Sequence, residues 1–324
     1  NGAIRSFVQS DKLRQLLGRF ATYVGGSPYL APATLNVIAH VELTGGVWYP
    51  QDGIYQIAKA MEKLTLEMGV EICTEHGVKQ ILVENGRVSG VLLENGSQMD
   101  ARIVVSNVDV AMTYQKMLSA NDVPQQRIDK MSSYEPSCSG FVMLLGVEVE
   151  HEQLAHHNIF FSEDYPAEFE AIFKDGLPPD DPTIYVAITS KTDSHHAPDG
   201  CENWFVLVNA PSLSEKYDWE QNKQQYRDLI LDKLAEKGFD IREKIRTETI
   251  LTPDDLQDMS GAWRGALYGP SANDKFAVFL RPHNRSKDVK GLYFAGGTTH
   301  PGGGVPMVTL SGKVAAEMVL EDKL

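Results

Sequence analysis

Apolar residues recur every three or four positions in several parts of this 324-residue chain, a spacing typical of amphipathic helices. The clearest case runs from Ile54 to Met68 and ends at Gly69, a residue type that commonly terminates helices. Two further helices are predicted near the start, at roughly 10–24 and 29–40. The chain therefore begins with a helical region, and its first β-rich stretch comes later.

Short runs rich in β-branched residues follow the predicted helix and are joined by Asn-Gly pairs. These pairs begin at Asn85 and Asn95, and Asn-Gly supplies the positive φ angles of a tight hairpin turn. The pattern predicts a three-stranded antiparallel meander over 78–105. A strand over 70–73 is expected to precede it.

The sequence pattern changes between about 110 and 255, where helical and strand-like segments are mixed. This mixture favours an α+β region inserted into the first one. Helices are predicted over 108–118, 124–131, 166–175 and 219–237. Strands are predicted over 138–149, 157–162, 183–190, 203–209 and 241–250.

The end of the chain predicts a strand over 292–295, a Gly-rich loop and a terminal helix starting near Pro306. A buried strand that runs into such a loop and then a helix presents backbone N–H groups, and the positive end of the helix, to an electron-rich ligand atom. Proline suits the first helical turn because its missing N–H costs nothing there. A tight turn without a ligand is the alternative, but the glycines exceed what a turn needs: Gly297, Gly302, Gly303 and Gly304.

The chain is acidic, with a formal net charge of −14. It offers no general positive field for a phosphate backbone, so nucleic-acid binding is not expected. The cysteines, Cys73, Cys138 and Cys201, lie far apart without a Cys-x-x-Cys pair, which argues against a zinc site or a disulfide framework and favours a reducing cytoplasm. The longest apolar run, Phe141 to Val147, is far shorter than the roughly 20 residues of a membrane span.

Several polar residues are candidates for chemistry or for bracing. The segment HEQLAHH, starting at His151, resembles the zinc motif His-Glu-x-x-His, but Ala155 stands where the second histidine would be. We therefore predict no metal site and expect a solvated surface there. Arg281 and Arg285 could anchor a phosphate or brace the loop by pairing with a carboxylate, and bracing is favoured. For His300 in the Gly-rich loop, proton handling and a bracing hydrogen bond both stay open.

Two stretches carry a family resemblance. Residues 279–320, FLRPHNRSKDVKGLYFAGGTTHPGGGVPMVTLSGKVAAEMVL, look like the C-terminal signature of bacterial-type phytoene desaturases, the carotenoid and dehydrosqualene desaturase family. Residues 45–61, GGVWYPQDGIYQIAKAM, and the meander after them resemble the family's middle section. Among the related amine-oxidase-like flavoproteins an acidic residue often follows Phe-Ala-Gly, where this chain has Gly297. Carotenoid desaturases share that departure.

The resemblance implies an FAD domain assembled from separate stretches, with a loop after the strand at 292–295 that lies along the flavin. The next helix would direct its N–H groups at the pyrimidine edge, where negative charge develops on reduction. Val78, in EHGVKQI, matches the position whose backbone contacts adenine. The ribityl and pyrophosphate side would be lined by Gly296 and Gly297, and the isoalloxazine ring would be approached by Val305, Pro306 and Met307.

The family opens with a Gly-x-Gly-x-x-Gly fingerprint that holds the FAD pyrophosphate, and this sequence is absent here. Together with the start at Asn1, this predicts a C-terminal fragment that is inactive by itself and self-associates through uncovered apolar surfaces. The fold class expected is α/β with mixed α+β content: an incomplete FAD-binding domain of the amine-oxidase-like type with an inserted substrate domain. Its segments would be substrate-domain helices (1–45), an FAD-domain segment with the meander (46–110), the substrate domain (111–255) and the C-terminal FAD-domain segment (256–324).

The function implied by the resemblance is an FAD-dependent desaturase that introduces C=C bonds into a long isoprenoid such as phytoene or a related carotenoid precursor. The flavin would take a hydride while a proton leaves the neighbouring carbon, and a quinone or oxygen would reoxidise it. No catalytic acid or base is assigned. Contact with a membrane at its periphery follows from the substrate class. The alternative is an isoprenoid-binding or escort protein of the same fold without redox activity.

Overall fold

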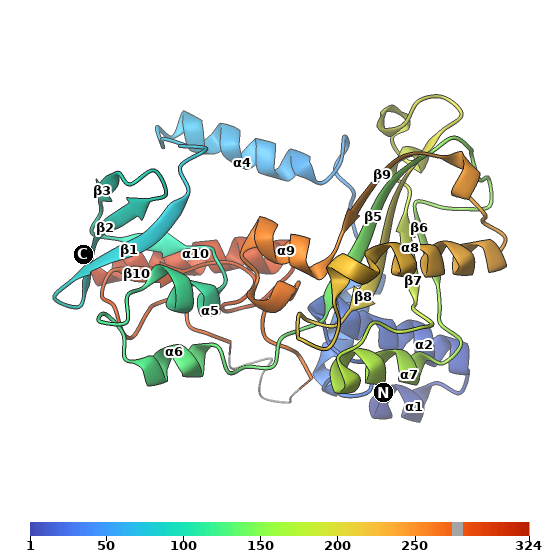
Figure 1. Cartoon of the computed structure of the whole chain (residues 1–324), viewed down its shortest axis with the longest axis horizontal. Helices are drawn as coiled ribbons and strands as arrows, with labels where there is room; N and C mark the ends of the chain where they lie inside the picture. Colours follow the sequence, from blue (N-terminus) through green and yellow to red (C-terminus); the bar gives the residue numbers. More distant parts are fainter. Residues whose placement is uncertain (274–280, 324) are drawn as a thin grey trace.

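The computed structural model describes residues 1–273 and 281–323. The first two residues of the signature-like stretch 279–320 therefore lie outside the described residues. Two lobes lie along the long axis of the molecule (Figure 1). We call them the large-sheet lobe, residues 1–45 and 137–252, and the small-sheet lobe, residues 55–135 and 281–323.

The large-sheet lobe is built on a five-stranded antiparallel sheet in the order β6-β7-β8-β5-β9. The central pair is in register from Ser139 opposite Ala210 to Val147 opposite Glu202. All five predicted strands are confirmed: β5 (Ser139–Val147), β6 (His157–Phe160), β7 (Ile184–Ala187), β8 (Glu202–Ala210) and β9 (Ile245–Leu251).

Helix α8 (Trp219–Glu236) covers one face of this sheet. Alternate side chains of the central strands point toward it, so Phe141 and Val206 are fully buried against Ile230 and its neighbours. The residues between them lie on the other side, which we call the open face: Leu144 and Phe205 stand opposite each other there and are 40% and 38% exposed.

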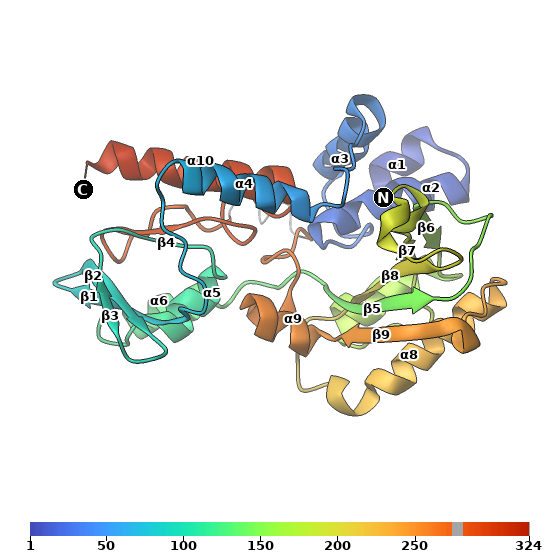
Figure 2. The same cartoon turned by 90° about the horizontal axis from the view of Figure 1, so that it is seen from above.

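The N-terminal helices lie on the side of the sheet opposite α8 (Figure 2). The predicted helix at 10–24 is confirmed and finishes as a 3₁₀ turn, whereas the one predicted at 29–40 begins only at Ala33. The elements of this lobe outside the sheet are α1 (Gly2–Phe7), α2 (Asp11–Arg19), η1 (Phe20–Val24), η2 (Ala33–Leu35), α3 (Asn36–His40), η3 (Val41–Gly45), α7 (Tyr165–Glu170), η5 (Ala171–Asp175), η6 (Thr189–Lys191), η7 (Ser194–His196) and η8 (Arg242–Lys244).

The small-sheet lobe contains the predicted meander: β1 (Val78–Glu84), β2 (Arg87–Leu93) and β3 (Gln98–Asp100). Its first turn has positive φ at both Asn85 and Gly86, as predicted. The last part of the expected third strand leaves the meander, however. It forms β4 (Val104–Ser106), which pairs in parallel with β10 (Leu292–Phe294), the strand predicted at 292–295.

The remaining helices connect or flank these sheets. The terminal helix α10 (Val305–Asp322) starts where predicted. Helix α9 (Pro253–Ser260) was not predicted, although Thr252 and Asp255 form a capping box that the sequence spacing could have revealed. The other elements are α5 (Val110–Met112), η4 (Thr113–Met117), α6 (Gln125–Met131) and η9 (Trp263–Gly265). Within the described ranges, no helix is both long and apolar enough to cross a bilayer.

Helix α4 (Tyr55–Glu67) confirms the amphipathic pattern but buries no residue. Figure 1 shows it set apart from α10 and from the meander. The strand predicted over 70–73 is wrong: these residues are irregular, and Val70 and Ile72 are 51% and 44% exposed. A β-like sequence cannot form a strand without a neighbouring strand to exchange hydrogen bonds with, and the described chain offers none at this point.

Candidate functional site

The predicted Gly-rich loop joins β10 to α10 and is packed on one side only. Gly302 has a φ of 136°, and a Cβ there would lie 3.0 Å from Arg281 Nε. A Cβ on Gly303 would lie 3.2 Å from Tyr268 Cδ1. A side chain at either position would therefore press on these two residues, and at Gly302 the positive φ disfavours one as well. At Gly304, in contrast, a Cβ would meet nothing within 4 Å.

The other side of the loop is open around the start of α10. Val305 and Met307 are 43% and 41% exposed, and Pro306 is exposed as well. Gly304 is the N-cap and offers no side chain to the first-turn N–H groups, and the structure assigns no side-chain cap to this helix. The positive end of an 18-residue helix thus faces outward beside a bare backbone, an arrangement that suits an electron-rich ligand.

Asn284 and Ser311 hold the loop to the elements on both sides. Asn284 Nδ2 donates hydrogen bonds to the carbonyls of Phe294 (3.1 Å) and His300 (3.0 Å) and to Ser311 Oγ (3.0 Å). Ser311 Oγ also accepts from the Gly296 N–H at 3.1 Å. Both residues are buried, so β10, the loop and α10 form one braced unit. Sequence reasoning missed this pair, because only the fold brings 284 and 311 together.

Arg281 braces the loop, as favoured from the sequence, whereas Arg285 braces the end of α10. Arg281 does so through carbonyls and not through a carboxylate: its Nη1 donates to Tyr268 O at 2.9 Å and to Gly297 O at 2.7 Å. Burial lowers the pKa of this guanidinium. Arg285 pairs through Nε with Asp322 at 2.8 Å, near the end of α10.

Within the described residues, the side chain of His300 forms no hydrogen bond, and a role in proton handling stays a prediction. Its backbone N–H donates to Pro282 O at 3.0 Å, its carbonyl accepts from Asn284, and the residue is exposed. Val78, the position predicted to contact adenine, is the first residue of β1 and is 39% exposed. The meander contacts the segment that precedes β10 through β2, where the Val88 N–H donates to Lys290 O at 2.9 Å. The predicted site residues thus all belong to the small-sheet lobe, and their contact with a cofactor stays a prediction.

A cavity of about 560 Å³, which we call the sheet cavity, lies between η1 and the open face of the large sheet. Its walls mix aromatic, aliphatic and polar groups. Tyr268 lines it and is the same residue whose ring supports Gly303, so this tyrosine connects the cavity with the Gly-rich loop. The lining comprises Arg19, Thr22, Tyr23, Glu42, Val47, His157, Ile159, Tyr165, Thr183, Tyr185, Phe205, Leu207, Asn209 and Tyr268.

A second cavity, of about 610 Å³, continues along the same face. It shares Phe205 with the sheet cavity and is also lined by Leu144, Gly146 and Thr247. The open face therefore carries two adjoining cavities, and only the first touches the tyrosine beneath the Gly-rich loop. Sequence reasoning placed substrate contacts in this region without naming residues.

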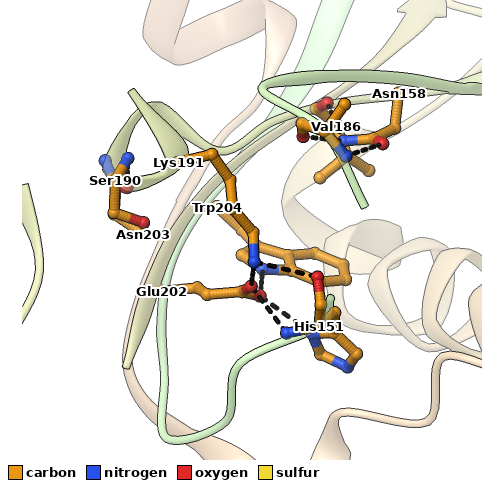
Figure 3. Close-up of polar contacts among 9 residues, drawn as sticks. His151, Asn158, Val186, Ser190, Lys191, Glu202, Asn203 and Trp204 are labelled. Atoms are coloured by element: carbon orange, nitrogen blue, oxygen red, sulfur yellow. Dashed lines mark hydrogen bonds and ion pairs between the residues drawn. The ribbon is translucent and has the colours of Figure 1, made fainter. Parts of the chain in front are cut away.

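The HEQLAHH segment is in part the solvated surface expected from its sequence, since four of its seven residues are exposed, but His151 braces the large-sheet lobe (Figure 3). His151 is only 12% exposed and its Nδ1 lies 2.8 Å from Glu202 Oε2. Glu202 also accepts from Lys191 Nζ at 2.6 Å and from Trp204 Nε1 at 2.8 Å. Burial alone would raise the pKa of Glu202, but these hydrogen bonds outweigh it and the pKa is lowered. Within the described part of the chain, no cluster of ligating side chains could hold a metal ion.

The comparisons with known proteins agree with this geometry. Residues 2–320 match the family model described as flavin containing amine oxidoreductase. The chain is 41% identical over 311 residues to a 1-hydroxycarotenoid 3,4-desaturase of Flavobacterium sp. (strain P99-3), covering 96% of this chain and 62% of that protein. It is 41% identical over 322 residues to a 4,4'-diapolycopene oxygenase of Methylomonas sp, covering 98% and 64%. The chain thus spans less than two thirds of the length of these curated relatives.

Solved structures show the same fold at low sequence identity. An oxidoreductase from Methanosarcina mazei matches with a TM-score of 0.65 at 19% identity, covering 98% of this chain and 67% of that one. A putrescine oxidase variant matches with a TM-score of 0.58 at 14% identity, covering 99% and 67%. The amine-oxidase-like fold class predicted from the sequence is confirmed. The chain belongs to the flavin containing amine oxidoreductase family, and its relatives at about 40% identity are carotenoid desaturases and oxygenases.

Proposed function

We propose that the whole protein is an FAD-dependent desaturase that introduces C=C bonds into a long isoprenoid such as phytoene or a related carotenoid precursor. The observation that carries this proposal is the position of Tyr268. Its ring supports the bare loop at Gly303 and also lines the sheet cavity. A cofactor on the loop and a substrate in the cavity would therefore meet across one residue.

The open side of the loop fits a flavin. Gly304 has free space where a Cβ would be, and the exposed backbone from Val305 to Met307 follows it. In this proposal Gly296 and Gly297 line the ribityl and pyrophosphate side, and Val78 contacts the adenine. Bound there, FAD would accept the hydride removed from the substrate. The start of α10 would stabilise negative charge at this position, because its N–H dipoles point outward there.

The large-sheet lobe would hold the isoprenoid. The open face supplies aliphatic and aromatic walls, such as Ile159, Phe205 and Leu207, that orient an apolar chain and keep water away from it. A quinone or oxygen would serve as the final electron acceptor. We further propose that the protein works in the cytoplasm at the periphery of a membrane, where such substrates reside, and that nucleic acid is not a partner.

Residues 1–324 alone would bind FAD weakly or not at all, since they contain no Gly-x-Gly-x-x-Gly sequence to hold the pyrophosphate. The test compares this chain with the whole protein by flavin absorbance, and then adds candidate polyenes to the whole protein without oxygen. We expect a yellow whole protein whose flavin absorbance is bleached by a polyene. A yellow protein that no isoprenoid reduces would contradict the proposal. A colourless one that binds polyenes would favour the non-redox escort.

A further inference from the structure

The sheet cavity contains one arginine whose guanidinium stacks on two tyrosines. Arg19, the last residue of α2, places its Cζ 5.6 Å from the ring centroid of Tyr23 and 5.5 Å from that of Tyr185. Tyr23 belongs to η1, whereas Tyr185 belongs to β7 on the opposite wall. The two rings therefore hold a positive charge inside a cavity that otherwise suits an apolar chain.

The residues around Arg19 supply neutral hydrogen-bonding groups, aliphatic walls and one carboxylate, that of Glu42. Tyr185 Oη lies 2.8 Å from His157 Nδ1. Burial raises the pKa of Tyr23 and of Tyr185, so both phenols stay protonated. Burial, the larger effect, and the nearby Arg19 charge lower the pKa of His157, which keeps the imidazole neutral at pH 7 although the Glu42 charge opposes this shift. Val47 and Ile159 complete this part of the wall.

Arg19 has hydrogen-bonding capacity beyond its contact with the side chain of Tyr23. Stacking occupies the faces of the guanidinium, while its five N–H groups lie in the plane. Within residues 1–273 and 281–323, no carboxylate oxygen forms an ion pair with it at 4.0 Å or less. Glu42 lines the same cavity and would repel an anionic ligand. The combination of a cation, two phenols and a nearby carboxylate suits a neutral oxygen on an apolar molecule.

We propose that Arg19, with the hydroxyls of Tyr23 and Tyr185, binds a hydroxyl or carbonyl oxygen at the end of the isoprenoid chain. The inference rests on the proposed function and names the substrate class more closely: a polyene with an oxygenated end. Because Tyr268 lines the same cavity, this end would lie near the Gly-rich loop, and the bond that reacts would be close to the oxygen. Arg19 is thus a specificity-determining residue, distinct from the residues of the proposed cofactor site.

The experiment uses the whole protein with FAD and three probes of one carbon skeleton: the linear polyene hydrocarbon, its terminal alcohol and its terminal aldehyde. The rate of anaerobic flavin reduction gives kcat/KM, and quenching of tryptophan fluorescence gives binding without turnover. The variants are Arg19→Met and Arg19→Lys, and Lys12→Met is the control because Lys12 is exposed on the same helix. The double variant Tyr23→Phe with Tyr185→Phe provides a second test that keeps the arginine in place.

We expect the protein to prefer an oxygenated probe, and Arg19→Met to lower kcat/KM for that probe by roughly 10- to 100-fold, the loss of a hydrogen bond from a charged donor. In Arg19→Met, kcat/KM for the hydrocarbon should change by less than about twofold. For the oxygenated probe, kcat/KM of Arg19→Lys should lie between the values of the parent and Arg19→Met, and Lys12→Met should match the parent. Comparison of the alcohol with the aldehyde tells which oxygen is bound. The double variant of Tyr23 and Tyr185 should also lower the preference for the oxygenated probes over the hydrocarbon.

Two results would overturn the inference while the proposed function stands. One is reduction of the flavin by the hydrocarbon and by the oxygenated probes at equal rates. The other is an equal loss for all three probes in Arg19→Met, which would make the arginine a brace between η1 and β7. A yellow protein that neither binds nor is reduced by any of the probes would instead remove the proposed function, and this inference with it.

Discussion

The two lobes contain amphipathic helices of the same kind in opposite environments. Helix α8 buries five residues against the large sheet, namely Trp219, Tyr226, Ile230, Leu231 and Leu234. Helix α4 buries none, although Met61 and Leu64 belong to an equally regular apolar stripe and are 53% and 57% exposed. An amphipathic pattern thus tells that a helix face needs a partner surface, but the pattern does not supply that surface.

In the large-sheet lobe every strand pairs with another strand of the chain, and α8 packs on one face of the sheet. The small-sheet lobe has a braced loop, a meander and a parallel strand pair, but α4 and the segment at 70–73 remain uncovered. A free amphipathic helix of 13 residues is marginal in water. The comparison therefore predicts that stability resides in one lobe and that the other is available for association.

The largest effect should come from the core of the large sheet. Phe141 is fully buried, with ring centroids 5.6 Å from Trp219 and 5.2 Å from Tyr226. We expect Phe141→Ala to lower the free energy of unfolding by about 3–5 kcal/mol, because it removes these contacts and leaves a cavity. Leu64→Ala on α4 is the control and should change it by less than about 0.5 kcal/mol. Urea unfolding followed by far-UV circular dichroism measures both. Equal losses would show that α4 is covered in solution.

The second effect is a pH dependence of the unfolding free energy that arises in the same lobe. Glu168 of α7 is 2% exposed, and its Oε2 accepts from Thr183 Oγ1 at 2.6 Å and from Ser162 Oγ at 2.8 Å. Burial raises the pKa of Glu168 from 4.5 to about 7 against these hydrogen bonds, and the Asp181 charge acts in the same direction as burial. Between pH 4.5 and 7 the folded state thus binds more protons than the unfolded state. Stability should fall as the pH rises through this window.

The whole contribution of Glu168 to this fall is about 3 kcal/mol, from the size of the pKa change. Glu168→Gln cannot titrate, so it should flatten the dependence of the unfolding free energy on pH between 4.5 and 7. Glu170→Gln, on the exposed side of the same helix, should leave the dependence unchanged. Unfolding curves at several pH values decide the matter, and parallel curves for parent and Glu168→Gln would refute the assignment.

The same comparison explains how much of the fold the sequence could predict. The strands of the large sheet were predictable because their alternation survives in a sheet whose neighbours are all present, as in Glu202–Ala210 with its alternating burial. The strand predicted over 70–73 does not form, because this sequence has β propensity but no partner strand. Tertiary context, which a linear pattern does not contain, decided between them.

The candidate site was predictable only in part for a similar reason. The Gly-rich loop is visible in the sequence because its residues are contiguous. The residues that support it are remote from one another: Tyr268, Asn284 and Ser311 become neighbours only through the fold. Arg19 was likewise invisible, since its role depends on Tyr185, which belongs to a strand far away in the sequence. Local motifs thus reveal backbone sites, while cavities lined by distant side chains require the structure.

A third and smaller effect concerns the brace within the small-sheet lobe. Ser311→Ala removes the acceptor for the Gly296 N–H and a partner of Asn284. We expect a loss of about 1 kcal/mol in unfolding free energy and, in the whole protein, weaker binding of FAD. Thr309→Ala is the matched control, because its hydroxyl bonds to Val305 O on the exposed side of α10. Unfolding curves and flavin titration measure the two quantities. Unchanged FAD affinity in Ser311→Ala would show that the braced loop does not contribute to binding of the cofactor.

The smallest effect on unfolding should come from α4, where association is the more informative quantity. We propose that residues 1–324 self-associate through this helix, since its apolar side chains are uncovered. The double variant Met61→Gln with Leu64→Gln should change the unfolding free energy by less than about 0.5 kcal/mol but lower the apparent mass in sedimentation velocity. Lys59→Gln with Lys63→Gln, also exposed on α4, is the control and should keep the parent's mass. If the parent chain sediments as a monomer at every concentration, the uncovered stripe does not drive association, and the difference between the lobes would concern packing alone.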